Sequence, residues 1–275
     1  MKGLSLPKPL LIIQPATSYD DMPATCAVHG DELAWFGAGC GVAREDILAV
    51  KVYRDEPLPD PADVRATIIT GAIDMVTDGH PWIERTAAWA RAAMAQGAPI
   101  LGVCFGHQLL AHALGGTVAD NPRGAMFGGV DVARTAAGAE DALFSALPPV
   151  ARMMVFHFQS VLALPEGAQV LATSGHDPHH AVRYAPRAWG VQFHPEFDAA
   201  IMAGSYDVYA EAITRAGFRC PRCAPPMPTR PMARPCCARS WPRPSHRARS
   251  RLCTGGCGGA GFQTHPASAP ARWYR

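Results

Sequence analysis

The 275-residue chain has no hydrophobic run long enough to span a membrane, and its first 218 residues hold few cysteines. The short apolar stretch Leu10–Ile13 lacks the length and cleavage site of a signal peptide, which favours a core strand. Only Cys26, Cys40 and Cys104 precede residue 219, as suits a reducing compartment. These absences predict a cytoplasmic protein that does not act at a membrane.

Residues 219–275 contain no Asp, Glu, Lys, Ile or Val, but they hold ten of the 26 prolines, six of the nine cysteines and eleven arginines. A segment so poor in large apolar side chains cannot bury enough surface to fold alone. We therefore expect a folded domain at residues 1–218 and a disordered tail at 219–275. The abrupt change in composition suggests a frameshifted C-terminus, and the tail's cysteine spacings match no standard zinc finger.

The tail also accounts for the positive charge of the chain. The whole chain has a net charge of +2, and the eleven tail arginines leave residues 1–218 with a net charge of −9. An acidic domain is not expected to bind nucleic acid.

Apolar runs and helical spacings alternate along the first half of the chain. Strands are expected at Leu10–Gln14, Leu48–Tyr53, Ala66–Thr70 and Ile100–Val103, and helices at Asp31–Phe36 and Trp82–Gln96. This order predicts a parallel sheet that is covered by helices on both faces.

The pattern changes after Gly116. Shorter strands are expected at Gly128–Ala133, Met153–Phe158 and Gln169–Ser174, followed by a core strand at Ala188–Phe193. A closing helix is expected at Ala199–Ala216, and its residues Ile201, Val208 and Ile213 are expected to pack on the sheet. Together the patterns predict an α/β fold of three layers. We expect a flavodoxin-like, doubly wound, mostly parallel sheet with a small antiparallel extension.

Two stretches carry the chemistry. The first joins a buried strand to a helix and reads Gly102-Val103-Cys104-Phe105-Gly106. It predicts a sharp turn with the thiol at its apex. The start of the helix favours the thiolate form of the cysteine and offers backbone N–H groups to an oxyanion. The second stretch, His194-Pro195-Glu196, follows an apolar strand and offers a base with a carboxylate to orient it.

Together these stretches resemble the class I glutamine amidotransferases over residues 9–217. The resemblance implies that Cys104 is the nucleophile, His194 the general base and Glu196 its orienting partner. It also implies an oxyanion hole formed by the backbone of Gly71 or Ala72 together with Phe105.

The same resemblance suggests where the substrate binds. Gln108 stands where the family contacts the α-amino and α-carboxylate groups of glutamine, and Phe158 and Gln159 replace the Gly and Asp of the family's glutamine-binding segment. The chain looks most similar to stand-alone proteins related to the amidotransferase domain of GMP synthase.

No metal or cofactor is expected. The stretch His176-Asp177-Pro178-His179-His180 contains potential ligands, but its turn signal favours a polar loop near the cleft.

The expected reaction is hydrolysis of a γ-glutamyl amide through a thioester on Cys104. Because the sequence has no P-loop, the released ammonia is expected to go to an unidentified acceptor or a partner synthetase. Three alternatives remain: a hydrolase of γ-glutamyl peptides or polyamine conjugates, another cysteine-dependent α/β-hydrolase, and a non-catalytic binding module.

Overall fold

The computed structural model describes residues 7–16 and 22–218. The expected tail at 219–275, with its cysteine pairs, lies outside these residues, so the proposed division at residue 218 stays a prediction.

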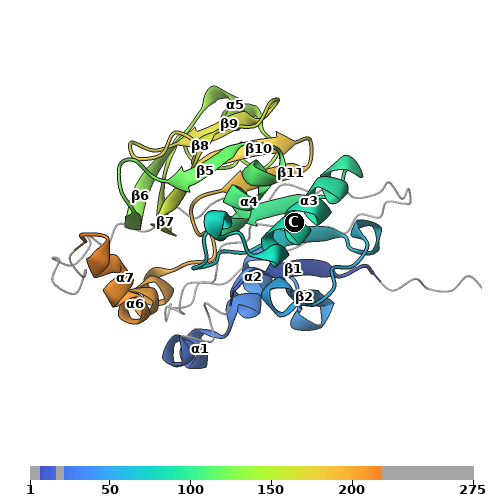
Figure 1. Ribbon diagram of the computed structural model, residues 1–275, viewed down its shortest axis with the longest axis horizontal. Helices are drawn as coiled ribbons and strands as arrows, with labels where there is room; N and C mark the ends of the chain where they lie inside the picture. The colour runs from blue at the N-terminus through green and yellow to red at the C-terminus, as the bar shows by residue number, and fades with distance from the viewer. Residues whose placement is uncertain (1–6, 17–21, 219–275) are drawn as a thin grey trace, which may run out of the picture.

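A nine-stranded sheet in the order β2-β1-β3-β4-β11-β10-β9-β6-β7 forms the centre of the molecule (Figure 1). The parallel strands are β1 (Leu10–Gln14), β2 (Ile47–Lys51), β3 (Ala66–Ile69), β4 (Ile100–Val103) and β11 (Ala188–Val191). The antiparallel strands are β6 (Met126–Arg134), β7 (Val150–His157), β9 (Gln169–Thr173) and β10 (Ala181–Ala185). The predicted fold class is confirmed, with the antiparallel extension continuing the same sheet.

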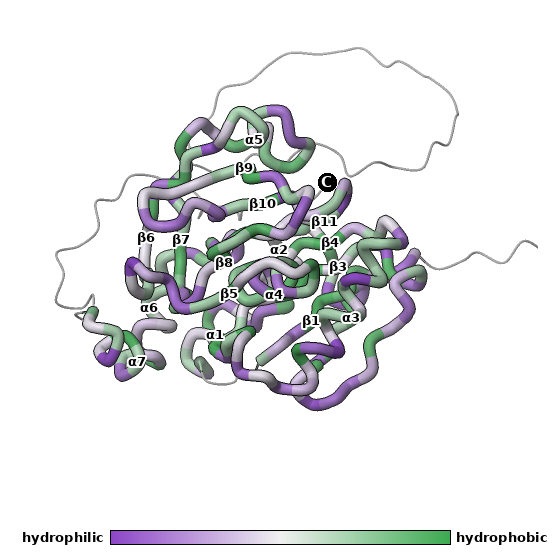
Figure 2. Tube along the Cα trace, turned by 45° about the horizontal axis from the view of Figure 1, so that its top comes forward, coloured by the Kyte–Doolittle hydropathy of each residue, from purple (hydrophilic) through white to green (hydrophobic). Residues whose placement is uncertain are grey.

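The alternation of side chains along β1 explains why both faces of the sheet are covered. Leu10 and Ile12 pack on one face with residues of α2 (Glu32–Cys40), whereas Leu11 and Ile13 pack on the other face with α3 (Pro81–Ala95) and α4 (Phe105–Ala113). Figure 2 shows the hydrophobic character of these central strands. No helix in the described part of the chain has the length and apolar character needed to cross a membrane.

Several short elements complete the fold. A separate ribbon pairs β5 (Thr117–Asp120) with β8 (Gln159–Ala163), while α1 (Pro23–His29) contacts α6 (Ala199–Val208) and α5 (Ala136–Glu140) contacts β9. Short 3₁₀ helices lie at Arg44–Asp46, Val52–Arg54, Pro61–Asp63 and Val76–Asp78.

The closing segment differs from the single helix that the sequence predicts. It divides at Tyr209 into α6 and α7 (Ala210–Arg215). Ile201 and Ile213 are buried as expected, but the placement of Val208 on the sheet is wrong, because this side chain is 39% exposed.

Candidate active site

Cys104 lies at the sharp turn between β4 and α4. Its backbone has φ 51° and ψ −102°, a conformation that costs free energy for a residue with a side chain and persists only where the surroundings fix it. The Cys104 N–H donates to the carbonyl of Val191 at 2.8 Å, and the Gly106 N–H donates to the carbonyl of Thr70 at 3.2 Å. These bonds hold the thiol at the carboxyl ends of β3, β4 and β11.

The two glycines of the turn lie where there is no room for a side chain. A Cβ atom on Gly106 would lie 2.2 Å from the carbonyl oxygen of Ile69, and one on Gly102 would lie 2.4 Å from the carbonyl oxygen of Gly106. Glycine at both positions therefore lets the helix start approach the two strands closely.

His194 follows β11 and pairs with Glu196. Its Nδ1 lies 2.7 Å from Oε1 of Glu196, and both side chains are buried. Its backbone N–H donates to the carbonyl of Met154 at 2.8 Å, which ties it to β7. His194 also lies beside Cys104, so the three residues that the sequence suggests are close together.

The electrostatics of this group favour a protonated imidazole. Burial by itself would lower the pKa of His194, but the charge of Glu196 and the charge and hydrogen bond of Cys104 raise this pKa to about 10. At neutral pH the arrangement therefore suits an imidazolium beside Cys104.

Two residues that the sequence did not suggest also contact the thiol. Sγ of Cys104 lies 3.5 Å from the carbonyl oxygen of Phe156 and 3.6 Å from Nε2 of Gln192. Gln192 could have been suggested from the sequence, because it stands only two residues before His194. The contact of Phe156 could not, because it depends on how β7 folds back towards Cys104.

Two of the three expected substrate-binding residues, Gln108 and Gln159, form a second buried group beside the thiol. Nε2 of Gln108 donates to the carbonyl of Gln159 at 2.7 Å and to Oε1 of Gln192 at 3.1 Å. The Gln159 side chain donates to Thr77 at 2.8 Å and to Asp120 at 3.1 Å. Gln108 is thus linked to the thiol through Gln192.

Phe158 lies half-buried at the bend between β7 and β8. Its carbonyl accepts a hydrogen bond from the Asn121 N–H at 3.1 Å, and its ring lies 5.3 Å from that of Phe127. The ring therefore joins an aromatic group rather than the hydrogen-bonded glutamines.

The residues expected to form the oxyanion hole lie close to the thiol. A Cβ atom on Gly71 would lie 2.9 Å from Cε1 of His194 and 3.7 Å from Cβ of Cys104. Ala72 follows it, and Phe105 is the first residue of α4, where helix N–H groups have no partner within the helix. Their role in binding an oxyanion stays a prediction.

A partly open cavity of about 370 Å³, counting its opening to solvent, lies at this point. It is lined by Met22, Gly71, Ala72, Ile73, Phe156, His194, Phe197, Ser205 and Tyr209. The lining is largely apolar and includes the imidazole.

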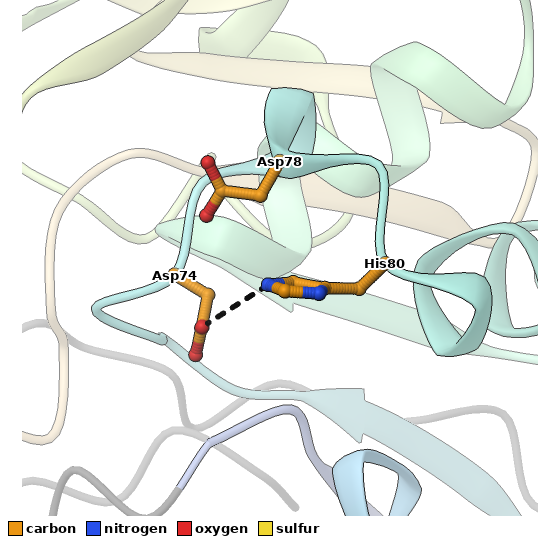
Figure 3. Close-up of side chains that lie close together, drawn as sticks. All are labelled: Asp74, Asp78 and His80. Atoms are coloured by element: carbon orange, nitrogen blue, oxygen red, sulfur yellow. Dashed lines mark ion pairs between the residues drawn. The ribbon is translucent and has the colours of Figure 1, made fainter.

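Among the described residues, one group has the geometry to share a metal ion. Ligand atoms of Asp74, Asp78 and His80 lie within 4.8 Å of one another, on the loop between β3 and α3 (Figure 3). Two of these residues already have structural partners: Asp78 accepts a hydrogen bond from the Met75 N–H at 2.7 Å, and His80 stacks on Trp82. Nε2 of His80 also lies 3.8 Å from Oδ1 of Asp74, so all three side chains already have partners without an ion.

The histidine-rich stretch at 176–180 is not simply a polar loop near the cleft. Asp177 and His180 are fully buried, and the His157 and His180 rings lie 6.5 Å apart. In the described ranges, the atoms of these residues do not form a group close enough to share an ion.

The chain is similar to known proteins in both sequence and fold. The family model of class I glutamine amidotransferases matches residues 44–205. A GMP synthase [glutamine-hydrolyzing] from Parafrankia sp. is 39% identical over 68% of this chain, and one subunit of the GMP synthase [glutamine-hydrolyzing] from Halobacterium salinarum is 33% identical over 55% of it. The chain spans 78% of that subunit but only 31% of the Parafrankia enzyme and 30% of the Aeropyrum pernix enzyme.

Solved structures show the same fold. A glutamine amidotransferase from Thermotoga maritima superposes with a TM-score of 0.61 at 20% identity, covering 78% of this chain and 86% of that one. A glutamine amidotransferase from Methylobacillus flagellatus has a TM-score of 0.58 at 26% identity, with 82% of each chain covered.

Proposed function

The chain belongs to the class I glutamine amidotransferases, and we propose that it hydrolyses the side-chain amide of a γ-glutamyl compound, glutamine included, through a thioester on Cys104. The observation that carries this proposal is the strained Cys104 at the helix start, beside the buried His194–Glu196 pair.

The first half-reaction needs an acid as well as a nucleophile. The Cys104 thiolate attacks the amide carbon, and the oxyanion accepts hydrogen bonds from the backbone of Phe105 and of Gly71 or Ala72. His194, whose pKa is raised to about 10, holds a proton at neutral pH and donates it to the departing nitrogen. The thioester then remains on Cys104.

The second half-reaction uses the imidazole as a base. After it has lost its proton, His194 accepts one from water, which attacks the thioester and releases the γ-carboxylate. Glu196 keeps the imidazole in one orientation and stabilises its charged form.

The ammonia acceptor is proposed to lie on a separate synthetase chain. The Halobacterium salinarum relative is named as one subunit of a GMP synthase, and this chain spans most of its length. Glutamine hydrolysis should then increase when the cognate synthetase is added.

A glutaminase assay on the purified chain tests the chemistry. Wild type should release glutamate, and Cys104→Ala should lose roughly 10³-fold or more of that rate, as expected when a nucleophile is removed. Cys26→Ala is the matched control, because this half-buried thiol lies on α1. If Cys104→Ala kept a substantial rate, the proposed function would be wrong.

A further inference from the structure

Aromatic side chains from three parts of the chain gather beside the cavity. Ring centroids lie 4.7 Å apart for Phe127 and Phe156, 5.3 Å for Phe127 and Phe158, 5.0 Å for Phe127 and Phe218, and 5.4 Å for Phe156 and Tyr209. These five residues are called the aromatic wall below. None of them is buried, and Phe218 is 39% exposed.

The aromatic wall is continuous with the reacting centre. Phe156 and Tyr209 line the cavity together with His194, and the carbonyl of Phe156 lies 3.5 Å from Sγ of Cys104. A group that is attached to the reacting amide would therefore lie beside Phe156 and Tyr209, the two wall residues that line the cavity.

The position of His194 shows which half of a substrate faces the wall. The imidazole must lie on the side of the departing nitrogen, because it donates the proton that this nitrogen needs. The hydrogen-bonding side chains of Gln108 and Gln192 form a separate group beside the thiol. The apolar space beside His194 is therefore where the amine half lies.

Ammonia has no apolar surface to place against such a wall. We propose that the wall binds the amine half of a γ-glutamyl amide whose amine is aromatic and uncharged. This proposal rests on the proposed function and narrows its substrate class. The described residues that line the cavity include no Asp, Glu, Lys or Arg, so nothing there pairs with the distal ammonium of a polyamine.

The proposed reaction needs water as its only co-substrate. The C–S bond to Cys104 forms as the C–N bond breaks, and the arylamine departs with the proton from His194. Water then gives a proton to His194 and its oxygen to the carbonyl carbon, the C–S bond breaks, and glutamate and the thiolate are released.

Steady-state kinetics of the full chain test the proposal with three amides: γ-glutamylanilide, glutamine and γ-glutamylputrescine. The anilide should have the highest kcat/KM. Tyr209→Ala should lower the anilide-to-glutamine ratio roughly tenfold, the change that about 1.4 kcal/mol of lost ring contact produces. Comparing this ratio between variants cancels the intrinsic reactivities of the amides.

Two further variants show whether a change in the ratio comes from the ring of Tyr209. Tyr209→Leu keeps most of the side-chain volume and should lower the same ratio even if the alanine variant folds poorly. Val208→Ala is the matched control, because this exposed neighbour on α6 is not part of the cavity lining. Its ratio should equal that of wild type.

The outcomes separate the two proposals. If glutamine is preferred and Tyr209→Ala leaves the ratio unchanged, the aromatic subsite is wrong while Cys104-dependent hydrolysis stands. A preference for γ-glutamylputrescine would overturn the uncharged-amine assignment. If no amide is hydrolysed in a Cys104-dependent manner, both proposals fail.

Discussion

At the scale of single residues, the site depends on charges that are held away from water. Glu196 is covered by the protein, and its carboxylate helps to raise the pKa of His194 against the opposing effect of burial. In the proposed reaction, the resulting imidazolium is the acid that protonates the departing nitrogen. The roles of both residues are therefore linked to a measurable pH dependence.

Replacing Glu196 with Gln should shift the alkaline limb of kcat/KM to lower pH. The charge that favours the imidazolium is lost, so His194 gives up its proton at a lower pH than about 10. The loss of rate near neutral pH should be smaller than for His194→Asn, for which we expect roughly 10²–10⁴-fold. The pH–rate profiles of the three proteins check this, and an unmoved alkaline limb in Glu196→Gln would contradict it.

The sequence alone suggests the candidate site residues that stand in short local motifs. It does not suggest the residues that only the fold brings to the cavity. Cys104 and the His194–Glu196 pair stand in recognisable short stretches. Phe156 and Tyr209 have no such signature, because they reach the cavity only when β7 and the α6–α7 junction fold back beside the turn that carries Cys104.

At the scale of elements, β1, β3 and β4 appear almost where the apolar runs predict them. Such strands are buried on both faces, so their sequences are continuous hydrophobic runs. The short strands β5, β8 and β10 were missed, since their pairing depends on partners far away in the sequence. The expected strand Leu48–Tyr53 ends early, at Lys51, where a 3₁₀ turn begins.

The packing of α4 against the strands gives a prediction about Gly106. Gly106→Ala should lower the free energy of unfolding by about 1–3 kcal/mol, because the new methyl group overlaps the Ile69 carbonyl. It should also lower the hydrolysis rate by displacing Cys104. Gly175→Ala is the control, as its Cβ would meet no atom within 4 Å. Urea unfolding curves of the two variants should differ, and equal stabilities would argue against the close approach.

At the scale of the whole molecule, a buried polar group lies where the extension joins the main sheet. Burial lowers the pKa of His107 to about 3, that of His157 to about 4 and that of His180 to about 3. In each ring Nε2 has no hydrogen-bond partner among the described residues, and Oδ2 of Asp177 has none either. The three imidazoles are therefore neutral in the folded protein at neutral pH.

This group predicts loss of stability in mild acid. Unfolded histidines bind protons below a pKa of about 6.5, while these three stay neutral in the fold down to about 4 or 3. Above a pH of about 6.5 the histidines are neutral in both the folded and the unfolded chain, so their burial does not depend on pH. As the pH falls from about 6.5 towards 4, only the unfolded chain binds the extra protons, and the free energy of unfolding therefore decreases.

Chemical unfolding measured at a series of pH values between 7 and 4 checks this dependence. His107→Gln should reduce the slope of stability against pH by about 1.4 kcal/mol per pH unit, the effect of one proton. His112→Gln is the control, since His112 lies at the surface beside Glu84. If both variants kept the wild-type slope, the neutral buried group would not be the cause.

We propose above that Cys104 is the activated nucleophile of a glutamine-binding cleft. The most direct test is to treat the full chain with a glutamine-mimicking electrophile and to measure, by peptide mass mapping, the labelling rate of each cysteine with and without glutamine. We expect Cys104 to be labelled faster than Cys26 and Cys40, and glutamine to protect Cys104 alone. Equal labelling rates at these cysteines, or labelling of Cys104 that glutamine does not slow, would contradict the account.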